Sequence, residues 1–389
     1  MKEVKGIPVF GDPIEEMALA QIERCATQAF RAALMADHHV GYSMPIGGVV
    51  AYVDAVSPSG VGYDIACGNK AVRLDVPARE VKRKIHVIMD DIARKIAFGI
   101  GRNNPEPVEH DLFEDSLWRR SRVIKSMRQK AANQLGTVGS GNHYVDLFID
   151  EEDRVWCGVH FGSRGLGHTI ATWFLEQGGG KDGMHTDATV FSTQSNLGED
   201  YLEHMELAGR YAYAGRDMVC QQVAKILKSN IVEEVHNHHN FAWKETHFGQ
   251  EVWVVRKGAT PAFPGQKGFV GGSMGDISVI LEGVESETSR NALYSTVHGA
   301  GRVLSRTQAA GKRRGRKREG GCVTPEMMNK WVKDKGVVLR GGGTDESPHC
   351  YKRLPKVLEH HSETIRVLHT LTPIGVAMAG ENEFDPYKD

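Results

Sequence analysis

Residues 294–306 read Tyr-Ser-Thr-Val-His-Gly-Ala-Gly-Arg-Val-Leu-Ser-Arg, which places one imidazole, His298, directly before a glycine turn and a guanidinium. Gly299 and Gly301 can adopt positive φ and let backbone N–H groups approach a ligand, and Arg302 offers a planar fork that suits phosphate oxygens. A neutral imidazole can attack phosphorus and hold the product as a phosphoramidate. The segment favours a phosphate-handling site with His298 as the reacting group. A buried histidine in the N-terminal turn of a helix is the open alternative.

Composition limits the class of protein. The chain has 389 residues, 40% hydrophobic and 25% charged, which is the profile of a soluble globular protein with a large core. Six scattered cysteines without a CxxC pair predict a reducing, cytoplasmic setting. Because no apolar run approaches the ~18 residues of a membrane span, we expect no membrane partner.

The net charge of −1 is unevenly distributed along the chain. A basic run is formed by Lys312, Arg313, Arg314, Arg316, Lys317 and Arg318. Such a run suits either a solvated surface or contact with a polyphosphate such as nucleic acid. The sequence leaves both interpretations open.

Candidate metal ligands stand beside glycine turns. Asp64 and Cys67 are three residues apart between glycines, a spacing that can bring both to one metal ion, although core packing also explains a cysteine. A glycine-rich turn at 135–142 leads into a predicted strand. Side chains alternate between the two faces of a strand, which would place His143 on one face and Asn142 and Asp146 on the other.

Two further segments add histidines. His160 ends a short predicted strand and enters a glycine loop that contains Arg164, a candidate phosphate contact or a solvated turn residue. Residues 235–241, Val-His-Asn-His-His-Asn-Phe, offer several possible ligands within five positions. We expect at least one metal ligand there.

Periodicity predicts the main elements. We expect one amphipathic helix over 14–34, a strand and then a helix over 72–99, a basic helix over 111–134, a long helix over 200–228 and a late strand at 374–378. A second glycine loop at 271–278 precedes a strand, and its donors could hold a nucleotide.

Taken together and in order, these motifs resemble the RtcB-type RNA ligases over nearly the whole chain. The motifs that carry the resemblance are Asp64-x-x-Cys67, Gly141-Asn142-His143, His160-Phe-Gly-Ser-Arg-Gly, His239-Asn240, Gly272-Ser273-Met274-Gly275 and His298-Gly-Ala-Gly-Arg.

The resemblance implies an enzyme that joins an RNA 3′-phosphate or 2′,3′-cyclic phosphate end to a 5′-hydroxyl end, with GTP and two Mn²⁺ ions, in RNA repair or tRNA splicing. It implies that His298 is guanylylated, that Asp37 orients His298, and that the metal ligands are Asp64, Cys67, His143, His160 and His239. It implies nucleotide contacts from Asn142, Asp146, Asn240, Gly272, Ser273, Met274, Ser278, Gly299, Ala300 and Gly301. It leaves open a helper or co-operating RNA-repair protein.

Two residue positions depart from the family pattern, and the expected metal rests on the family alone. Asp146 stands where the family has a glutamate that reads guanine, and Met378 or Ala379 stands where the family ends in Lys-Gly. Thiolate and imidazole bind zinc more tightly than manganese, so the expectation of manganese rests on the family. These departures favour a divergent bacterial paralogue and put the identity of the nucleotide in question.

We expect one mixed α/β (α+β) domain over residues 1–380, with mixed sheets around a central metal and nucleotide cleft, followed by a polar tail at 381–389. Two other functions stay open. Paired metal ions could activate water in a phosphodiesterase or phosphatase. A non-catalytic RNA-binding paralogue could act through the basic run.

Overall fold

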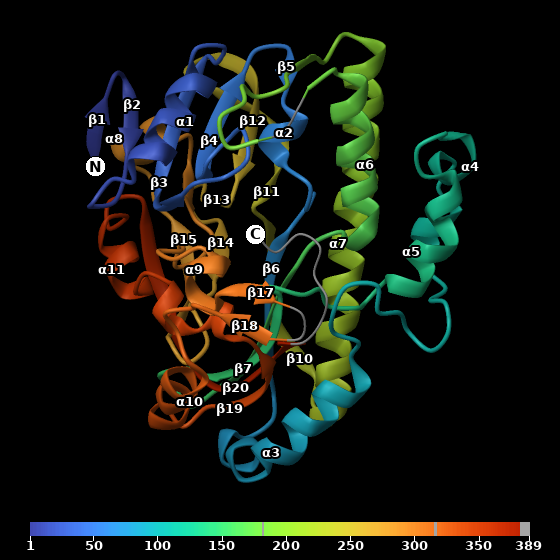
Figure 1. Cartoon of the computed structure of the whole chain (residues 1–389), viewed down its shortest axis with the longest axis vertical. Helices are drawn as coiled ribbons and strands as arrows, with labels where there is room; N and C mark the ends of the chain where they lie inside the picture. The colour runs from blue at the N-terminus through green and yellow to red at the C-terminus, as the bar shows by residue number, and fades with distance from the viewer. Residues whose placement is uncertain (181–182, 315–316, 382–389) are drawn as a thin grey trace.

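Two β-sheets carry the fold, and the chain passes directly from one to the other at His239 (Figure 1). The structure is a computed structural model that describes residues 1–180, 183–314 and 317–381. One sheet has the strand order β1-β2-β3-β4-β12-β11. The larger has the order β10-β6-β8-β7-β20-β15-β14, with β19 parallel to β20. The predicted mixed α/β class is confirmed.

The strands of the first sheet are β1 (Lys2–Val4), β2 (Ile7–Val9), β3 (Arg31–His39), β4 (Ile46–Tyr52), β12 (Gln250–Lys257) and β11 (Asn240–His247). Those of the larger sheet are β10 (Ile231–His238), β6 (Gly68–Leu74), β8 (Val155–Phe161), β7 (Tyr144–Ile149), β20 (Ile365–Gly380), β15 (Ser278–Gly283), β14 (Lys267–Val270) and β19 (Val338–Gly342). Short ladders pair β13 (Ala259–Pro261) with β16 (Ser295–Val297), β17 (Lys312–Arg314) with β18 (Lys317–Glu319), and β5 (Ala55–Val56) with β9 (Phe191–Ser192).

The helices are α1 (Glu16–Ala26), α2 (Pro58–Val61), α3 (Ala78–Lys95), α4 (Leu117–Arg120), α5 (Arg128–Gln134), α6 (Arg164–Gln177), α7 (Asn196–Leu227), α8 (Glu287–Asn291), α9 (Arg306–Ala310), α10 (Pro325–Asp334) and α11 (Leu354–Glu359). Short 3-10 turns lie at Asp111–Glu114, Lys125–Met127, Thr344–Glu346 and Pro348–Cys350. The 32-residue α7 runs along the long axis of the molecule beside α6 and packs on β6 and β8 (Figure 1). No described helix is long and apolar enough to cross a membrane.

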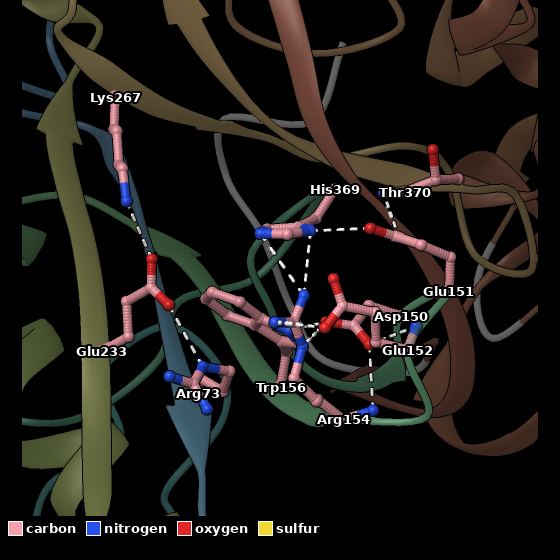
Figure 2. Close-up of polar contacts among 10 residues, drawn as sticks. All are labelled: Arg73, Asp150, Glu151, Glu152, Arg154, Trp156, Glu233, Lys267, His369 and Thr370. Carbon is pink, nitrogen blue, oxygen red and sulfur yellow. Dashed lines mark hydrogen bonds and ion pairs between the residues drawn. The ribbon is translucent and has the colours of Figure 1, made fainter.

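The larger sheet curls until its edge strands β10 and β14 meet, which makes it a nearly closed barrel. The Phe269 N–H of β14 donates to the Asn237 amide oxygen of β10 over 3.3 Å. The Glu233 carboxylate of β10 lies 2.9 Å from the Lys267 ammonium of β14 and 3.1 Å from Nε of Arg73 on β6 (Figure 2). These side-chain contacts hold the two edge strands against each other and partly cover their edges.

Two predicted helices are wrong in part. The predicted helix over 14–34 ends at Ala26, and Arg31 begins β3, in which residues 32–38 are all buried. A continuous apolar run has no periodicity that separates a buried strand from a helix. The predicted helix over 111–134 breaks into α4, α5 and two 3-10 turns, because the Ser121 hydroxyl accepts from the N–H groups of Val123 and Ile124 and competes with helical bonding.

The other predicted elements are confirmed. β6 and α3 occupy the predicted strand and helix of 72–99, α7 covers 200–228, and β20 contains 374–378. Two regions named from the sequence lie outside the described residues: the tail beyond Glu381, and the basic run, in which residues 315–316 and the side chains of 313–318 are not described.

The tight turn between β7 and β8 is organised by one buried carboxylate (Figure 2). Asp150 Oδ1 accepts from the backbone N–H groups of Glu152 and Arg154 over 3.0 and 2.9 Å. Its Oδ2 accepts from Nε of Arg154 over 2.7 Å and from Nε1 of Trp156 over 2.8 Å. Four donors therefore satisfy a side chain that is fully buried.

The same turn is tied to β20. His369 lies 3.0 Å from Arg154 Nη2 and 2.7 Å from Glu151 Oε1, and the backbone N–H of Thr370 donates to Glu151 Oε2 over 2.9 Å (Figure 2). These contacts fix β7 between β8 and β20, and β7 is the strand that leads out of the predicted site segment at 142–143.

We predict that Asp150→Ala lowers the free energy of unfolding by about 3 kcal/mol, because it leaves several buried donors without an acceptor. Urea denaturation measures the change. Glu152→Ala is the matched control, since that side chain is 60% exposed and its ion pair with Arg154 contributes less than about 1 kcal/mol. Equal stability of the two variants would contradict this account of the turn.

Candidate active site

The strand register gathers the predicted site residues at one end of the larger sheet. Cys67 immediately precedes β6, His143 immediately precedes β7, and His160 is the penultimate residue of β8. The antiparallel pairs Asn69↔His160 and Tyr144↔His160 place these three positions side by side. His239 follows β10 at the same end. Residues far apart in the sequence therefore meet because alternate strands begin or end there.

A buried carboxylate holds His298. Asp37 is completely buried, and its Oδ2 lies 2.7 Å from Nδ1 of His298. The same oxygen accepts from the backbone N–H groups of His298 over 3.0 Å and Gly299 over 3.3 Å. Burial raises the pKa of Asp37, but the charge and hydrogen bonds of His298 outweigh it, and the pKa lies below its ordinary value. The carboxylate fixes both the ring and the turn that carries it.

The backbone around Asp37 leaves the β3–β4 ladder between Leu34 and His39. Side chains replace the lost ladder partners: Lys352 Nζ donates to the carbonyls of Ala36 and His38 over 2.9 and 3.1 Å, and the N–H of Ala36 donates to Nε2 of His361 over 3.2 Å. This bulge turns the Asp37 carboxylate toward the loop of His298. Gly301 has φ +79°, and a Cβ there would collide with the Asp37 carbonyl.

Thiol, imidazole and carboxylate groups converge beside His298. Cys67 Sγ lies 3.7 Å from Nε2 of His143 and 3.7 Å from Nε2 of His160. Asp64 Oδ2 lies 3.1 Å from Nε2 of His143. The His239 ring stacks on the His160 ring at 5.0 Å between centroids and lies 4.8 Å from the His298 ring. Cys67, His143 and His160 therefore bring possible ligand atoms within 4.8 Å of one another, with Asp64 beside His143 and the His239 ring beside those of His160 and His298.

The chemistry of this set fits a bound cation. Nδ1 of His239 is buried and has no hydrogen-bond partner in the described part of the chain, and Nε2 of His143 and Nε2 of His160 both face the Cys67 thiol. Burial, followed by the charges of neighbouring imidazoles, places the pKa values of His160 and His239 well below the ordinary range, so both rings are neutral and can donate lone pairs. Burial and the Asp64 charge raise the pKa of the Cys67 thiol, and a cation would favour its thiolate.

The predicted faces of the strand after residue 142 need correction. β7 begins only at Tyr144, so the alternation does not extend back to Asn142 and His143. Both of those side chains approach His160: the Asn142 amide nitrogen lies 3.4 Å from His160 Nε2, and the His143 ring centroid lies 5.5 Å away. Alternation holds from Tyr144 onward, with Val145 and Leu147 in one core cluster and Tyr144 and Phe148 in another.

Two glycine loops form the other wall. Gly271 and Gly299 make a parallel bridge, which sets the 271–278 loop beside the His298 turn with its buried Ala300. In that loop the Gly272 N–H donates to Ser278 Oγ over 3.0 Å. Ser273 Oγ is buried and has no partner within the described residues, and Met274 is buried.

Asp146 and Asn240 have different environments. Asp146 is buried on β7, its Oδ1 lacks a partner within the described residues, and burial raises its pKa well above the ordinary value. Asn240 is occupied by protein: its amide donates to the Asp64 carbonyl over 3.3 Å and accepts from Gly258 N–H over 2.7 Å. Asn240 therefore ties the Asp64 loop to β11.

The two predicted phosphate contacts already bind protein groups. Arg164 Nη2 donates to the Gly99 carbonyl over 3.1 Å and its Nε to Thr137 Oγ1 over 3.3 Å. Arg302 donates to Tyr351 Oη over 2.8 Å and to Asp345 O over 2.7 Å, and it lies 3.2 Å from Glu346. A phosphate role for either arginine stays a prediction.

The site is supported by three residues that the sequence did not single out: Asn69, Lys352 and Arg216. Asn69 Oδ1 lies 2.6 Å from His160 Nδ1, while its amide donates to the carbonyls of Phe269 and His298 over 2.9 and 3.1 Å. Lys352 supports the Asp37 bulge. Arg216, on α7, donates to the carbonyl of Ala66, the residue that precedes Cys67. One signal was present in the sequence: Arg216 interrupts an otherwise apolar helix face between Ala212 and Cys220.

The comparisons with known proteins agree with this geometry. A family model described as tRNA-splicing ligase RtcB matches residues 18–120 and 111–379. The RNA-splicing ligase RtcB of Escherichia coli (strain K12) is 32% identical over 94% of this chain and 94% of its own length. The tRNA-splicing ligase RtcB of Thermococcus kodakarensis is 31% identical over 88% of this chain and 86% of its own length. The RNA-splicing ligase RtcB of Mycobacterium tuberculosis is 31% identical over 88% of this chain and 95% of its own length.

These matches identify an enzyme of the ligase class. The chain belongs to the RtcB family of RNA ligases, as the sequence motifs predicted.

We predict that a divalent ion raises the melting temperature of the protein and that Cys67→Ser removes most of the increase, because the thiolate is the strongest ligand of the set. Ligand at 100 times its Kd contributes about 2.7 kcal/mol to folding. Thermal denaturation with and without Mn²⁺ or Zn²⁺ measures the effect. Cys322→Ser, at the exposed cysteine, is the matched control. An unchanged metal response of Cys67→Ser would exclude Cys67 as a ligand.

Proposed function

We propose that this protein joins an RNA end with a 3′-phosphate or 2′,3′-cyclic phosphate to a 5′-hydroxyl end, using GTP and two Mn²⁺ ions. The observation that carries the proposal is the pairing of Asp37 with Nδ1 of His298, next to the thiol and imidazole cluster. The names of the relatives, RNA-splicing and tRNA-splicing ligase, support RNA as the substrate. The physiological role is RNA repair or tRNA splicing.

His298 is the nucleophile of the first step. An Nδ1–H that donates to the Asp37 carboxylate leaves the lone pair on Nε2. Nε2 attacks the α-phosphorus of GTP, a bond to phosphorus forms, and pyrophosphate leaves. Asp37 stabilises the positive charge that develops on the ring. Water first opens a 2′,3′-cyclic phosphate end to a 3′-phosphate. The oxygen of the RNA 3′-phosphate then attacks the guanylyl phosphorus and releases His298. The 5′-hydroxyl attacks the activated 3′-phosphate, loses its proton to water, and GMP leaves.

Asp64, Cys67, His143, His160 and His239 hold the metal ions in this proposal. Bound ions supply neutralisation of phosphate charge and stabilisation of the entering and departing oxygens. Asn69 fixes the His160 ring through Nδ1, which leaves Nε2 for coordination. The choice of manganese rests on the family, because this donor set alone favours zinc.

Asp146 reads the guanine base in this proposal, and Ser273 together with the 299–301 turn contacts the nucleotide. Both Asp146 Oδ1 and Ser273 Oγ are buried with no partner in the described ranges, and buried polar atoms normally have one. The position of the family's terminal lysine is apolar here: Met378 is buried and packs in one cluster with Tyr144 and Met274. The charge of that lysine therefore has no counterpart at Met378.

A metal-dependent phosphodiesterase would need the same cation cluster but no carboxylate behind His298. Asp37 makes three contacts to the His298 turn and none to the cation cluster in the described residues. This arrangement favours His298 as a nucleophile over hydrolysis alone.

We predict that wild-type protein incubated with Mn²⁺ and GTP labelled at the α-phosphate acquires an acid-labile label that His298→Ala lacks. Asp37→Asn reduces the labelling rate by about 100-fold, because the ring is no longer held in the reacting orientation. His86→Ala, on the exposed face of α3, labels like the wild type. Label on His298→Ala would place the nucleophile at another residue. RNA cleavage without GTP, by protein that acquires no label, would favour the phosphodiesterase.

We predict that Asp146→Ala loses the preference for GTP over ATP in the same assay. One or two hydrogen bonds from guanine N–H groups to the Asp146 carboxyl contribute about 0.5–1.5 kcal/mol each, or roughly 2- to 10-fold each. Competition of unlabelled GTP and ATP against labelled GTP gives the ratio. Glu152→Ala, on the far turn of β7, provides the control. A preserved ratio in Asp146→Ala would place guanine recognition elsewhere.

A further inference from the structure

Arg216 is a completely buried cation in the middle of α7. Its Nη1 donates to the carbonyl oxygens of Ala66 and Phe161 over 3.0 and 2.6 Å. Its Nε donates to Nε2 of His236 over 2.8 Å, and its Nη2 lies 2.9 Å from Nδ1 of His238. All three guanidinium nitrogens therefore have a short-range partner, and none of these partners is a carboxylate.

Three of the four groups that Arg216 contacts adjoin a predicted metal ligand in the sequence. Ala66 precedes Cys67, Phe161 follows His160, and His238 precedes His239. These three segments belong to different strands, and apart from β-pairing they share Arg216 as a common partner. The guanidinium of Arg216 therefore contacts all three segments, which are also joined by β-pairing and by the hydrogen bond from the His239 N–H to the Cys67 carbonyl.

The buried guanidinium of Arg216 restricts the residues that can pack around it. A Cβ at position 68 would lie 3.0 Å from Arg216 Cζ and would also collide with the Asn237 carbonyl, so the residue after Cys67 is glycine. Burying a guanidinium without a carboxylate partner is unfavourable unless its donors are satisfied. The planar geometry of arginine allows it to bind carbonyls and imidazoles in several directions within one plane, which the ammonium of lysine does not.

We infer that Arg216 is a positioning residue for the cation site, which holds the segments of Cys67, His160 and His239 at the separation that metal binding requires. The inference rests on the proposed function, because it takes these three residues as metal ligands. Arg216 itself touches neither the ligand side chains nor the His298 ring through any hydrogen bond in the described residues.

The test is calorimetric titration of Mn²⁺ into metal-free wild type, Arg216→Met, Arg216→Lys and Arg210→Met, with the melting temperature of each metal-free protein measured in parallel. Residues that orient metal ligands typically change metal affinity by about 10- to 100-fold. We expect Arg216→Met to raise the Kd for Mn²⁺ by that factor and Arg216→Lys to recover part of the loss. Arg210→Met is the matched control, because Arg210 lies on the same helix with its side chain 52% exposed.

A second readout separates positioning from general stability. We expect excess Mn²⁺ to restore His298 labelling in Arg216→Met with an unchanged KM for GTP, whereas a merely structural role would lower the melting temperature and leave the Kd of the folded protein unchanged. Wild-type Mn²⁺ affinity in folded Arg216→Met overturns the inference. If Arg216→Met does not fold, the Kd of Arg216→Lys for Mn²⁺ decides instead, and a wild-type Kd again overturns the inference. Failure of both variants to fold also overturns the inference. Absence of Mn²⁺ binding by the wild type would instead contradict the proposed function.

Discussion

The site depends on one buried carboxylate, that of Asp37. A carboxylate removed from water requires donors, and here three N–H groups of the His298 turn donate to Oδ2, while Oδ1 has no partner within the described residues. This requirement shapes the neighbouring backbone. β3 leaves its ladder before Asp37, Lys352 takes up the carbonyls that the bulge exposes, and Gly301 lets the His298 turn approach the bulge.

The cation cluster follows from a second constraint, the register of the larger sheet. Cys67 and His143 precede strands, whereas His160 and His239 end or follow strands. In an antiparallel arrangement such positions fall at one end of a sheet. The passage of the chain from β10 into β11 at His239 then brings the first sheet, and with it Asp37 and the His298 turn, to the same end. The predicted ligands and His298 are therefore adjacent because two sheets meet there.

The sequence predicted which segments reach the site better than it predicted their secondary structure. Glycine near histidine, cysteine or aspartate marked the segments of Cys67, His143, His160 and His298, because backbone turns that bring side chains together favour residues free of a Cβ, whereas the His239 segment has no glycine. The apolar run before Asp37 misled the helix prediction, since a strand buried on both faces has no periodicity. Asn69, Lys352 and Arg216 act through backbone carbonyls and ring nitrogens of distant segments. A local pattern marks Arg216 on its apolar helix face, but it does not identify the groups that Arg216 contacts.

The sequence alone determined the family and the mixed α/β class, and it predicted the reacting histidine and the metal ligands, because each follows from local residue types and their order. Only the tertiary structure decided which groups are adjacent. It showed that Asn142 and His143 both approach His160, that Arg302 is already bound by Tyr351 and Asp345, and that Arg216 links three ligand segments. The physical reason is that distance, burial and hydrogen-bond partnership arise from strand register and sheet packing, which involve residues far apart in the chain.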